Sequence, residues 1–181
     1  MSVVQLYLGE VKKNVGSTFK DVLRDSPGEL RWEGEKILFA QPITVEVRLT
    51  NCGSEILVEG TLITVLVLDC SRCLEPFLYP MNVDFKLELR NVDRLNRPSD
   101  LEAEAEETDE IKYFCEHDNY VDITKDLEEL ILINLPMKPL CRPECLGICP
   151  VCGANRNEVQ CGCEVGEVDP RLAVLKTWKS L

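Results

Sequence analysis

The chain has 181 residues, ten of them cysteines, with 45% apolar residues and a formal net charge of −12. This length fits one medium domain or a domain with a small appendage, and the apolar content is enough for a core without cross-links. The longest apolar stretch, residues 56–68, is far below the roughly 20 residues of a membrane-spanning helix, and the amino terminus lacks a signal-peptide pattern. We therefore expect a cytoplasmic protein with reduced thiols, which argues against a disulfide framework.

The negative charge is concentrated in one segment. Residues 99–130 contain thirteen acidic residues against two lysines, so the remainder of the chain is nearly neutral. A run of this composition predicts a solvated flexible loop. It does not exclude a basic face elsewhere.

The first forty residues give the weakest patterns. Residues 2–9 indicate a short strand, and residues 17–25 an amphipathic turn or two of helix. Residues 30–40 are typical of a hairpin that turns at Glu33–Gly34.

A clear β pattern follows. Residues 43–50 alternate between apolar and polar, residues 55–68 are apolar on both faces as in a central strand, and residues 79–90 alternate again. This pattern predicts an antiparallel β-meander or partly closed sheet, with a pair of cysteines in its second turn. With a few helices around it, the fold class is α+β.

Two helices are predicted near the carboxyl terminus. Asp122 caps the first, over residues 121–136, and Pro136 stops it. Asp169 and Pro170 start the second, which runs to the end of the chain.

Three parts follow from these patterns. They are a β-rich domain over residues 1–98, an acidic flexible loop over residues 99–120, and a segment over residues 121–181. The last segment holds both helices and the cysteine-rich stretch, and we expect it to pack on the β domain.

Eight cysteines form four closely spaced pairs. Two thiolates two to four residues apart can reach one tetrahedral ion, and a glycine after the second lets backbone amides turn toward the sulfurs. "CPVCG", residues 149–153, matches this pattern closely. The candidate metal ligands are Cys70, Cys73, Cys141, Cys145, Cys149, Cys152, Cys161 and Cys163.

The spacing allows two arrangements of structural zinc in a ribbon-like carboxyl-terminal segment. In one, residues 70 and 73 join 141 and 145 around a first ion, and 149, 152, 161 and 163 hold a second. In the other, the four cysteines of residues 141–152 hold one ion and the rest are free. Zinc is favoured over an iron–sulfur cluster because glycine-containing turns and a short ribbon suit a closed site.

Catalytic patterns are missing from the sequence. A redox C-x-x-C needs a helix amino terminus, whereas Cys70 and Cys73 lie between two predicted strands. His117, Cys52 and Cys115 are interpreted as exposed or ordinary residues, and no phosphate-binding or nucleophile motif is present. We expect a protein that is not an enzyme.

Three stretches together resemble one family. They are "LDCSRCLEPF", "VDITKDLEELILINLPMKPLC" with the cysteines after it, and "DPRLAVLKTWK". In this order they are similar to the YceD-like large ribosomal RNA subunit accumulation proteins, over roughly residues 40–181. The resemblance implies a non-enzymatic factor of the bacterial cytoplasm that supports accumulation or processing of large-subunit (23S) ribosomal RNA. It supplies no catalytic residue.

Three modes of action remain open. The protein could bind ribosomal RNA or a pre-ribosomal particle, with Arg142 and Arg156 contacting phosphates and Trp178 either stacking on a base or, as we prefer, docking on the core. It could instead be a zinc-stabilised adaptor whose acidic loop binds a basic ribosomal protein. A thiol oxidoreductase is the third alternative.

Overall fold

Nine strands, two short 3-10 helices and one α-helix are present in the residues that this computed structural model describes, namely 3–26, 29–32, 34–94 and 111–163. The chain divides into two compact units: residues 69–76 and those from 138 onward form the second, and the remainder forms the first. The elements are β1 (Gln5–Tyr7), η1 (Val11–Lys13), β2 (Thr18–Asp25), β3 (Glu29–Trp32), β4 (Glu35–Phe39), β5 (Ile43–Asn51), β6 (Glu55–Asp69), β7 (Pro76–Asn91), η2 (Val92–Arg94), β8 (Ile111–Phe114), β9 (Tyr120–Asp122) and α2 (Thr124–Ile133).

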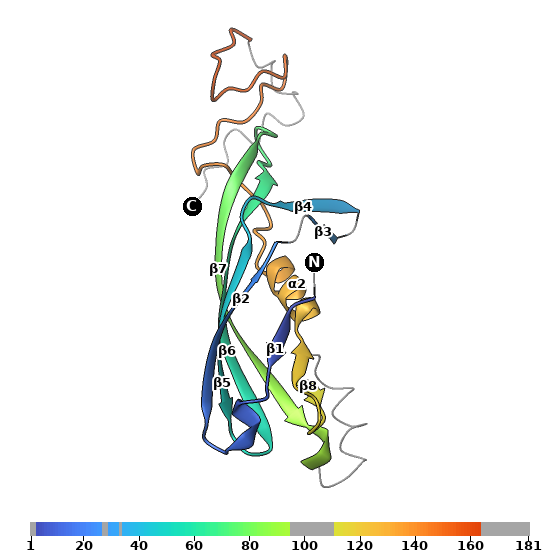
Figure 1. Ribbon diagram of the computed structural model, residues 1–181. Helices are drawn as coiled ribbons and strands as arrows, with labels where there is room; N and C mark the ends of the chain where they lie inside the picture. Colours follow the sequence, from blue (N-terminus) through green and yellow to red (C-terminus); the bar gives the residue numbers. More distant parts are fainter. Residues whose placement is uncertain (1–2, 27–28, 33, 95–110, 164–181) are drawn as a thin grey trace, which may run out of the picture. The chain divides into compact units, whose positions relative to one another are not determined.

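A curled sheet of seven strands forms the first unit (Figure 1). Its order is β2-β5-β6-β4-β3, and β7 pairs with β6 and with β8. The pairs β2–β5, β5–β6, β4–β6 and β3–β4 are antiparallel, whereas β8 runs parallel to β7. A separate antiparallel pair joins β1 to β9.

The predicted meander and hairpin are confirmed. In β5, Val45 and Val47 are buried while Glu46 and Arg48 between them are exposed, as the period of two requires. The long strand β6 occupies the centre, because β4, β5 and β7 all pair with it. Strands β3 and β4 pair antiparallel as the expected hairpin, and Gly34 between them has a φ of +89° that favours glycine.

The predicted helical turn over residues 17–25 is wrong, because these residues form strand β2. All eight residues of β2 pair with β5, from Thr18 opposite Thr50 to Asp25 opposite Ile43. Apolar residues three and four apart suggested a helical face, yet Val22 is 52% exposed and only Phe19 and Leu23 pack on the core. Tertiary pairing therefore decides the conformation of this segment.

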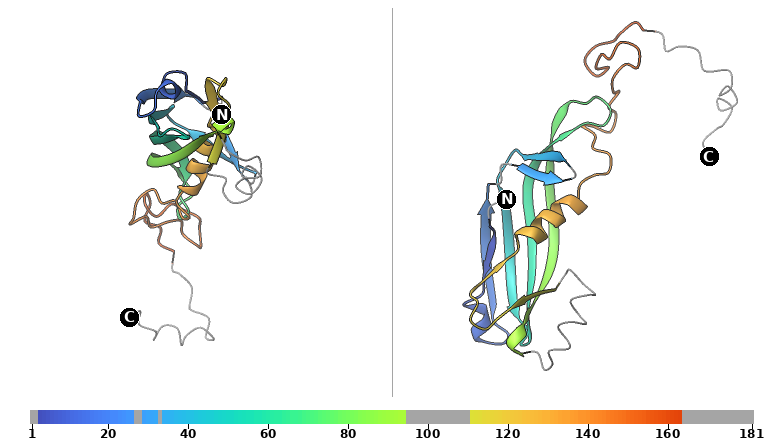
Figure 2. Two further views of the ribbon diagram at one scale, coloured as in Figure 1. Left: turned by 90° about the horizontal axis from the view of Figure 1, so that it is seen from below. Right: turned by 90° about the vertical axis from the view of Figure 1, so that its right-hand side faces the viewer.

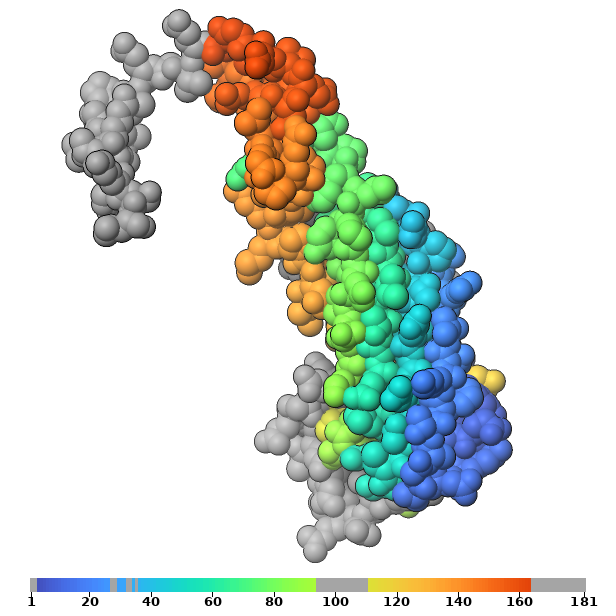
Figure 3. Space-filling view, turned by 90° about the vertical axis from the view of Figure 1, so that its left-hand side faces the viewer, coloured from blue at the N-terminus to red at the C-terminus, as the bar shows by residue number. Residues whose placement is uncertain are grey.

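One face of the sheet carries the core of the first unit. Helix α2 lies across this face (Figures 1 and 2) and buries Leu127 and Ile131 in a cluster with Leu62 and Leu66 of β6. The predicted cap is wrong by one residue, because Ile123 is at the N-cap and Asp122 ends β9, although Asp122 Oδ1 still accepts the Thr124 N–H at 2.8 Å. On the opposite face, β2, β5, β6 and β7 lie side by side with no described helix over them (Figure 3).

The fold is richer in β structure than the predicted α+β class. Only α2 is an α-helix among the described residues, and the predicted helix over residues 169–181 lies outside them. Residues 111–114, placed in the predicted acidic loop, form β8 because a parallel partner is available at Glu88–Asn91. No helix in the described ranges has both the length and the hydropathy to cross a membrane.

Candidate metal centres

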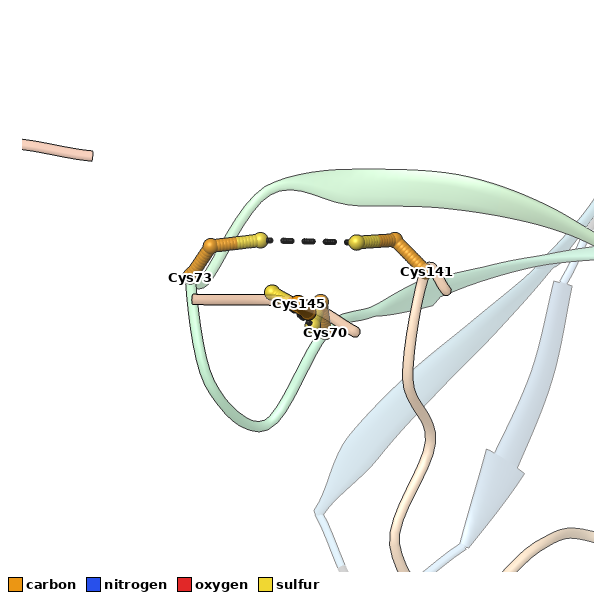
Figure 4. Close-up of side chains that lie close together, drawn as sticks. All are labelled: Cys70, Cys73, Cys141 and Cys145. Carbon is orange, nitrogen blue, oxygen red and sulfur yellow. Dashed lines mark hydrogen bonds between the residues drawn. The ribbon is translucent and has the colours of Figure 1, made fainter. Parts of the chain in front are cut away.

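The second unit brings eight cysteines together in two groups of four. The first group combines Cys70 and Cys73, in the turn between β6 and β7, with Cys141 and Cys145, which follow α2 in the chain (Figure 4). The second group consists of the four cysteines at 149, 152, 161 and 163. Within each group the sulfur atoms lie within 4.8 Å of one another.

The first group has the dimensions of a tetrahedral thiolate site. A zinc–sulfur bond of about 2.3 Å requires sulfur atoms about 3.8 Å apart in a regular tetrahedron. The Sγ atoms of Cys70 and Cys145 are 3.8 Å apart, and those of Cys73 and Cys141 are also 3.8 Å apart (Figure 4). Cys70, Cys73 and Cys145 are buried, so these sulfurs are shielded from solvent. The residues present therefore fit an ion of this size.

The turn that holds Cys70 and Cys73 is closed by backbone bonds. The Cys70 N–H donates to Glu75 at 3.0 Å, and the Leu74 N–H donates back to the Cys70 carbonyl at 2.9 Å. Leu74 has a φ of +62°, a left-handed conformation that an L side chain adopts at a cost. The same bond recurs in the second group, where the Gly153 N–H donates to the Cys149 carbonyl at 2.8 Å. Gly153 has a φ of +72°, again in the left-handed region. The two turns thus share one backbone geometry.

Arg72 connects this turn to the segment after α2. Its guanidinium donates to the carbonyls of Pro143 and Cys145, at 3.2 and 2.9 Å, and its own carbonyl accepts the Ile148 N–H at 3.0 Å. Gly147 is required at this contact, since a Cβ there would lie 3.0 Å from the Arg72 carbonyl oxygen and its φ is +74°. Bonds from the Arg72 side chain and backbone therefore bring the two halves of the first group together.

Backbone amides also set the charge on the first group. The amides of Cys141, Cys73 and Arg72 hold the pKa of Cys70 at about 6, well below the ordinary value for a thiol. Burial and the neighbouring thiols raise the pKa of Cys141 to about 12. The group therefore holds a thiolate at Cys70 readily but resists four thiolates together, and a divalent cation supplies the charge that offsets them.

The second group repeats this electrostatic arrangement. The amides of Cys152 and Val151 lower the pKa of Cys149 to about 6. The Cys152 thiol and burial raise the pKa of Cys163 to about 12. Each group thus has an easily ionised sulfur to receive an ion, Cys70 in the first and Cys149 in the second, and one that resists ionisation, Cys141 or Cys163.

The structure assembles the first of the two groupings that the spacing allowed. Cysteines 141 and 145 lie with 70 and 73, and cysteines 149 and 152 lie with 161 and 163. A single site made from residues 141–152 would need cysteines that the structure divides between the two groups. Cys52 lies exposed in the turn between β5 and β6 and belongs to neither.

Asn157 is a site residue that the spacing of cysteines does not reveal. Its Nδ2 donates to Cys145 Sγ at 3.3 Å, and its Oδ1 accepts the Leu146 N–H at 2.9 Å. The first bond favours a thiolate at Cys145, and the second fixes the amide in place. Only the sequence "NRN" could have suggested it, because asparagines in such turns hydrogen-bond their own backbone.

We expect Asn157→Asp to weaken metal binding at the first group about 10–100-fold, as for other partners of metal ligands. The substitution keeps the oxygen that accepts the Leu146 N–H but replaces the donor to Cys145 with a negative oxygen. Competition with a chromophoric zinc chelator measures the effect. Glu158→Gln, an exposed neighbour, is the control, and equal affinity of the two variants would contradict the role of Asn157.

Residues predicted to contact RNA are only partly described. Arg142 and Arg156 are both exposed, and neither is paired with a carboxylate in the part of the chain that the structure describes. Trp178 lies outside the described residues, as does most of the predicted acidic loop, from residue 99 to 110.

Comparison with known proteins identifies one family. The profile of the family "Large ribosomal RNA subunit accumulation protein YceD" matches residues 58–179. An uncharacterized protein of Mycobacterium tuberculosis is 31% identical over 137 residues, which are 74% of this chain and 60% of the relative.

Two plant proteins are similar at lower identity, and both are named large ribosomal RNA subunit accumulation protein YCED homolog 1, chloroplastic. The Zea mays protein is 27% identical, over 68% of this chain and 49% of its own length. The Arabidopsis thaliana protein is 24% identical, over 71% and 46%. The chain thus spans about half to three fifths of these relatives. No solved structure matches significantly.

Proposed function

Because the chain belongs to the YceD family of large ribosomal RNA subunit accumulation proteins, we propose that it supports the accumulation or processing of large-subunit ribosomal RNA without being an enzyme. Two relatives carry this role in their names. Its partner is the ribosomal RNA itself or a pre-ribosomal particle, and in a bacterial cell it acts in the cytoplasm.

The observation that carries the molecular part of this proposal is the pair of four-cysteine groups. We assign a structural zinc ion to each, because four cysteine ligands at tetrahedral spacing leave no open position for a substrate. Oxygen-preferring ions are disfavoured by an all-sulfur ligand set. The ions give shape to a cysteine-rich unit that, over its described residues, contains no helix and no strand beyond one isolated bridge and the ends of β6 and β7.

The same unit offers cations for phosphate. Lys138, Arg142 and Arg156 are exposed, and none is paired with a carboxylate among the residues described. A free guanidinium can bind phosphate oxygens with two hydrogen bonds and displace a counterion. We propose that this unit contacts RNA through these side chains.

The double variant Arg142→Ala/Arg156→Ala is expected to weaken RNA binding and to flatten its salt dependence. Loss of two phosphate contacts on single-stranded RNA reduces the slope of log K against log salt by about 1.4. Fluorescence anisotropy with fragments of 23S ribosomal RNA, at several salt concentrations, measures both quantities.

The matched control is Lys20→Ala/Arg24→Ala, which removes the same charge from exposed positions of β2. A nonspecific charge effect would weaken binding equally in both double variants. That result would reject the second unit as the contact surface.

The adaptor alternative places the contact in the acidic segment instead. Ultraviolet crosslinking in cells separates the two, since direct RNA contact gives crosslinks to uridines and the adaptor gives crosslinks only to lysine-rich peptides.

A thiol oxidoreductase, the third alternative, would show a reactive cysteine. We expect instead that the thiols resist alkylation until a chelator is added, because four of them are buried, namely Cys70, Cys73, Cys145 and Cys149.

A further inference from the structure

The chain's single histidine lies in a second kind of ligand cluster, in the first unit. Asp93 belongs to η2, directly after β7, while Cys115 and His117 lie in the turn between β8 and β9. One ligand atom from each of the three side chains lies within 4.8 Å of the others. Residues more than twenty positions apart in the chain thus converge on one point.

Hydrogen bonds hold this arrangement independently of an ion. The Glu116 N–H donates to Asp93 Oδ2 at 2.6 Å, which joins the two segments directly. The buried Asn91 accepts the Asp93 N–H through Oδ1 at 3.0 Å and donates from Nδ2 to a Glu116 carboxylate oxygen at 2.6 Å. The three ligands therefore sit on a framework anchored at the end of β7.

The charges around the cluster are mostly negative. The Asp93 carboxylate lies beside the Cys115 thiol and the His117 ring, and Asp118 accepts the Cys115 N–H at 2.9 Å while its Oδ1 is 3.6 Å from His117 Nε2. A carboxylate beside a ligating imidazole orients the ring and increases its basicity. Lys12 donates to the Glu116 and Asp118 carbonyls, so one cation also touches this turn.

A nitrogen, a sulfur and an oxygen ligand together suit a borderline divalent ion. Zinc accepts all three, and three protein ligands leave a fourth position for water or an outside ligand. Asp93 and His117 are exposed and Cys115 is half-buried, whereas three of the four cysteines in the first group are buried. An ion here is therefore expected to bind more weakly and to exchange.

We propose that Asp93, Cys115 and His117 form a third metal site, for zinc or a similar divalent transition ion, with one open coordination position. This assignment does not depend on the proposed function. Asp93 precedes the acid-rich residues 95–110 in the chain, and Cys115 and His117 follow them. A bound ion would therefore link η2 to the turn between β8 and β9.

The test uses the tag-free full chain with its tightly bound ions in place, and zinc chloride as the added probe. Because the chain has one histidine, its imidazole protons give unique NMR signals. We expect those signals to shift on addition of one further equivalent of zinc. Added cobalt(II) should likewise produce a sulfur-to-cobalt absorption band from a single cysteine.

Two ligand variants and one control complete the design. His117→Ala is expected to lower affinity for the added ion at least about tenfold, and Cys115→Ser should abolish the cobalt–sulfur band. Cys52→Ser removes an exposed cysteine outside the cluster and should change nothing. Binding of no further equivalent, or binding that survives both ligand variants, would overturn the proposal. Loss of the two tight ions would count only against the four-cysteine assignment.

Discussion

Replacing Cys145 with serine is expected to lower the zinc content from two ions per chain to one and to unfold part of the second unit. Cys145 is buried, and its sulfur lies 3.8 Å from that of Cys70. A structural zinc ion in a small domain contributes on the order of 10–16 kcal/mol of apparent binding free energy at neutral pH. The described residues of this unit bury few side chains besides the cysteines, so little else could hold it together.

Native mass spectrometry and atomic absorption measure the ion count, and proton NMR shows which unit loses its fold. Cys52→Ser is the matched control because Cys52 is exposed and belongs to neither group. The first unit should remain folded in both variants, since none of its buried core residues is a cysteine. A Cys145→Ser protein that is purified without added zinc and retains two tightly bound ions would refute the proposed grouping.

The substitution Ile131→Ala is expected to lower the free energy of unfolding of the first unit more than any other change considered. Ile131 is fully buried on α2, in the cluster formed with the sheet. Removal of such a side chain in a close-packed core costs about 2–5 kcal/mol, because lost transfer free energy and an unfilled cavity both destabilise the folded state. This is a large part of the 5–15 kcal/mol that stabilises a typical domain.

Urea unfolding of the metal-loaded protein measures the free energy of unfolding, with an unchanged m-value expected. Ile133→Ala is the control, since Ile133 lies on the same helix but is 81% exposed, and its truncation should change the free energy by less than about 0.5 kcal/mol. Similar losses for both variants would mean that α2 does not pack on the sheet as described.

Local sequence patterns were sufficient to predict those strands and helices whose tertiary contacts favour the same conformation. The alternation around Val45 and Val47 predicted β5, and Gly34 marked the hairpin, because both signals depend on side chains within one strand or turn. Helix α2 was predicted for the same reason, since its apolar stripe and its Pro136 stop are local. Strand β2 was missed because its pairing with β5 outweighs a weak helical pattern.

The candidate sites needed the tertiary structure to different degrees. Spacing alone identified the cysteine pairs, because a turn of two to four residues brings two sulfurs to one ion wherever it occurs. It could not decide which pairs combine, since Cys73 and Cys141 are separated by 68 positions and are brought together by long-range contacts such as those of Arg72. Asp93 and His117 were likewise unremarkable in the sequence, and the pairing of β8 with β7 and the hydrogen bonds at the end of β7 bring them together. The sequence thus determines which side chains can bind a metal. Which of them share one ion depends on long-range contacts of the backbone, which no local pattern encodes.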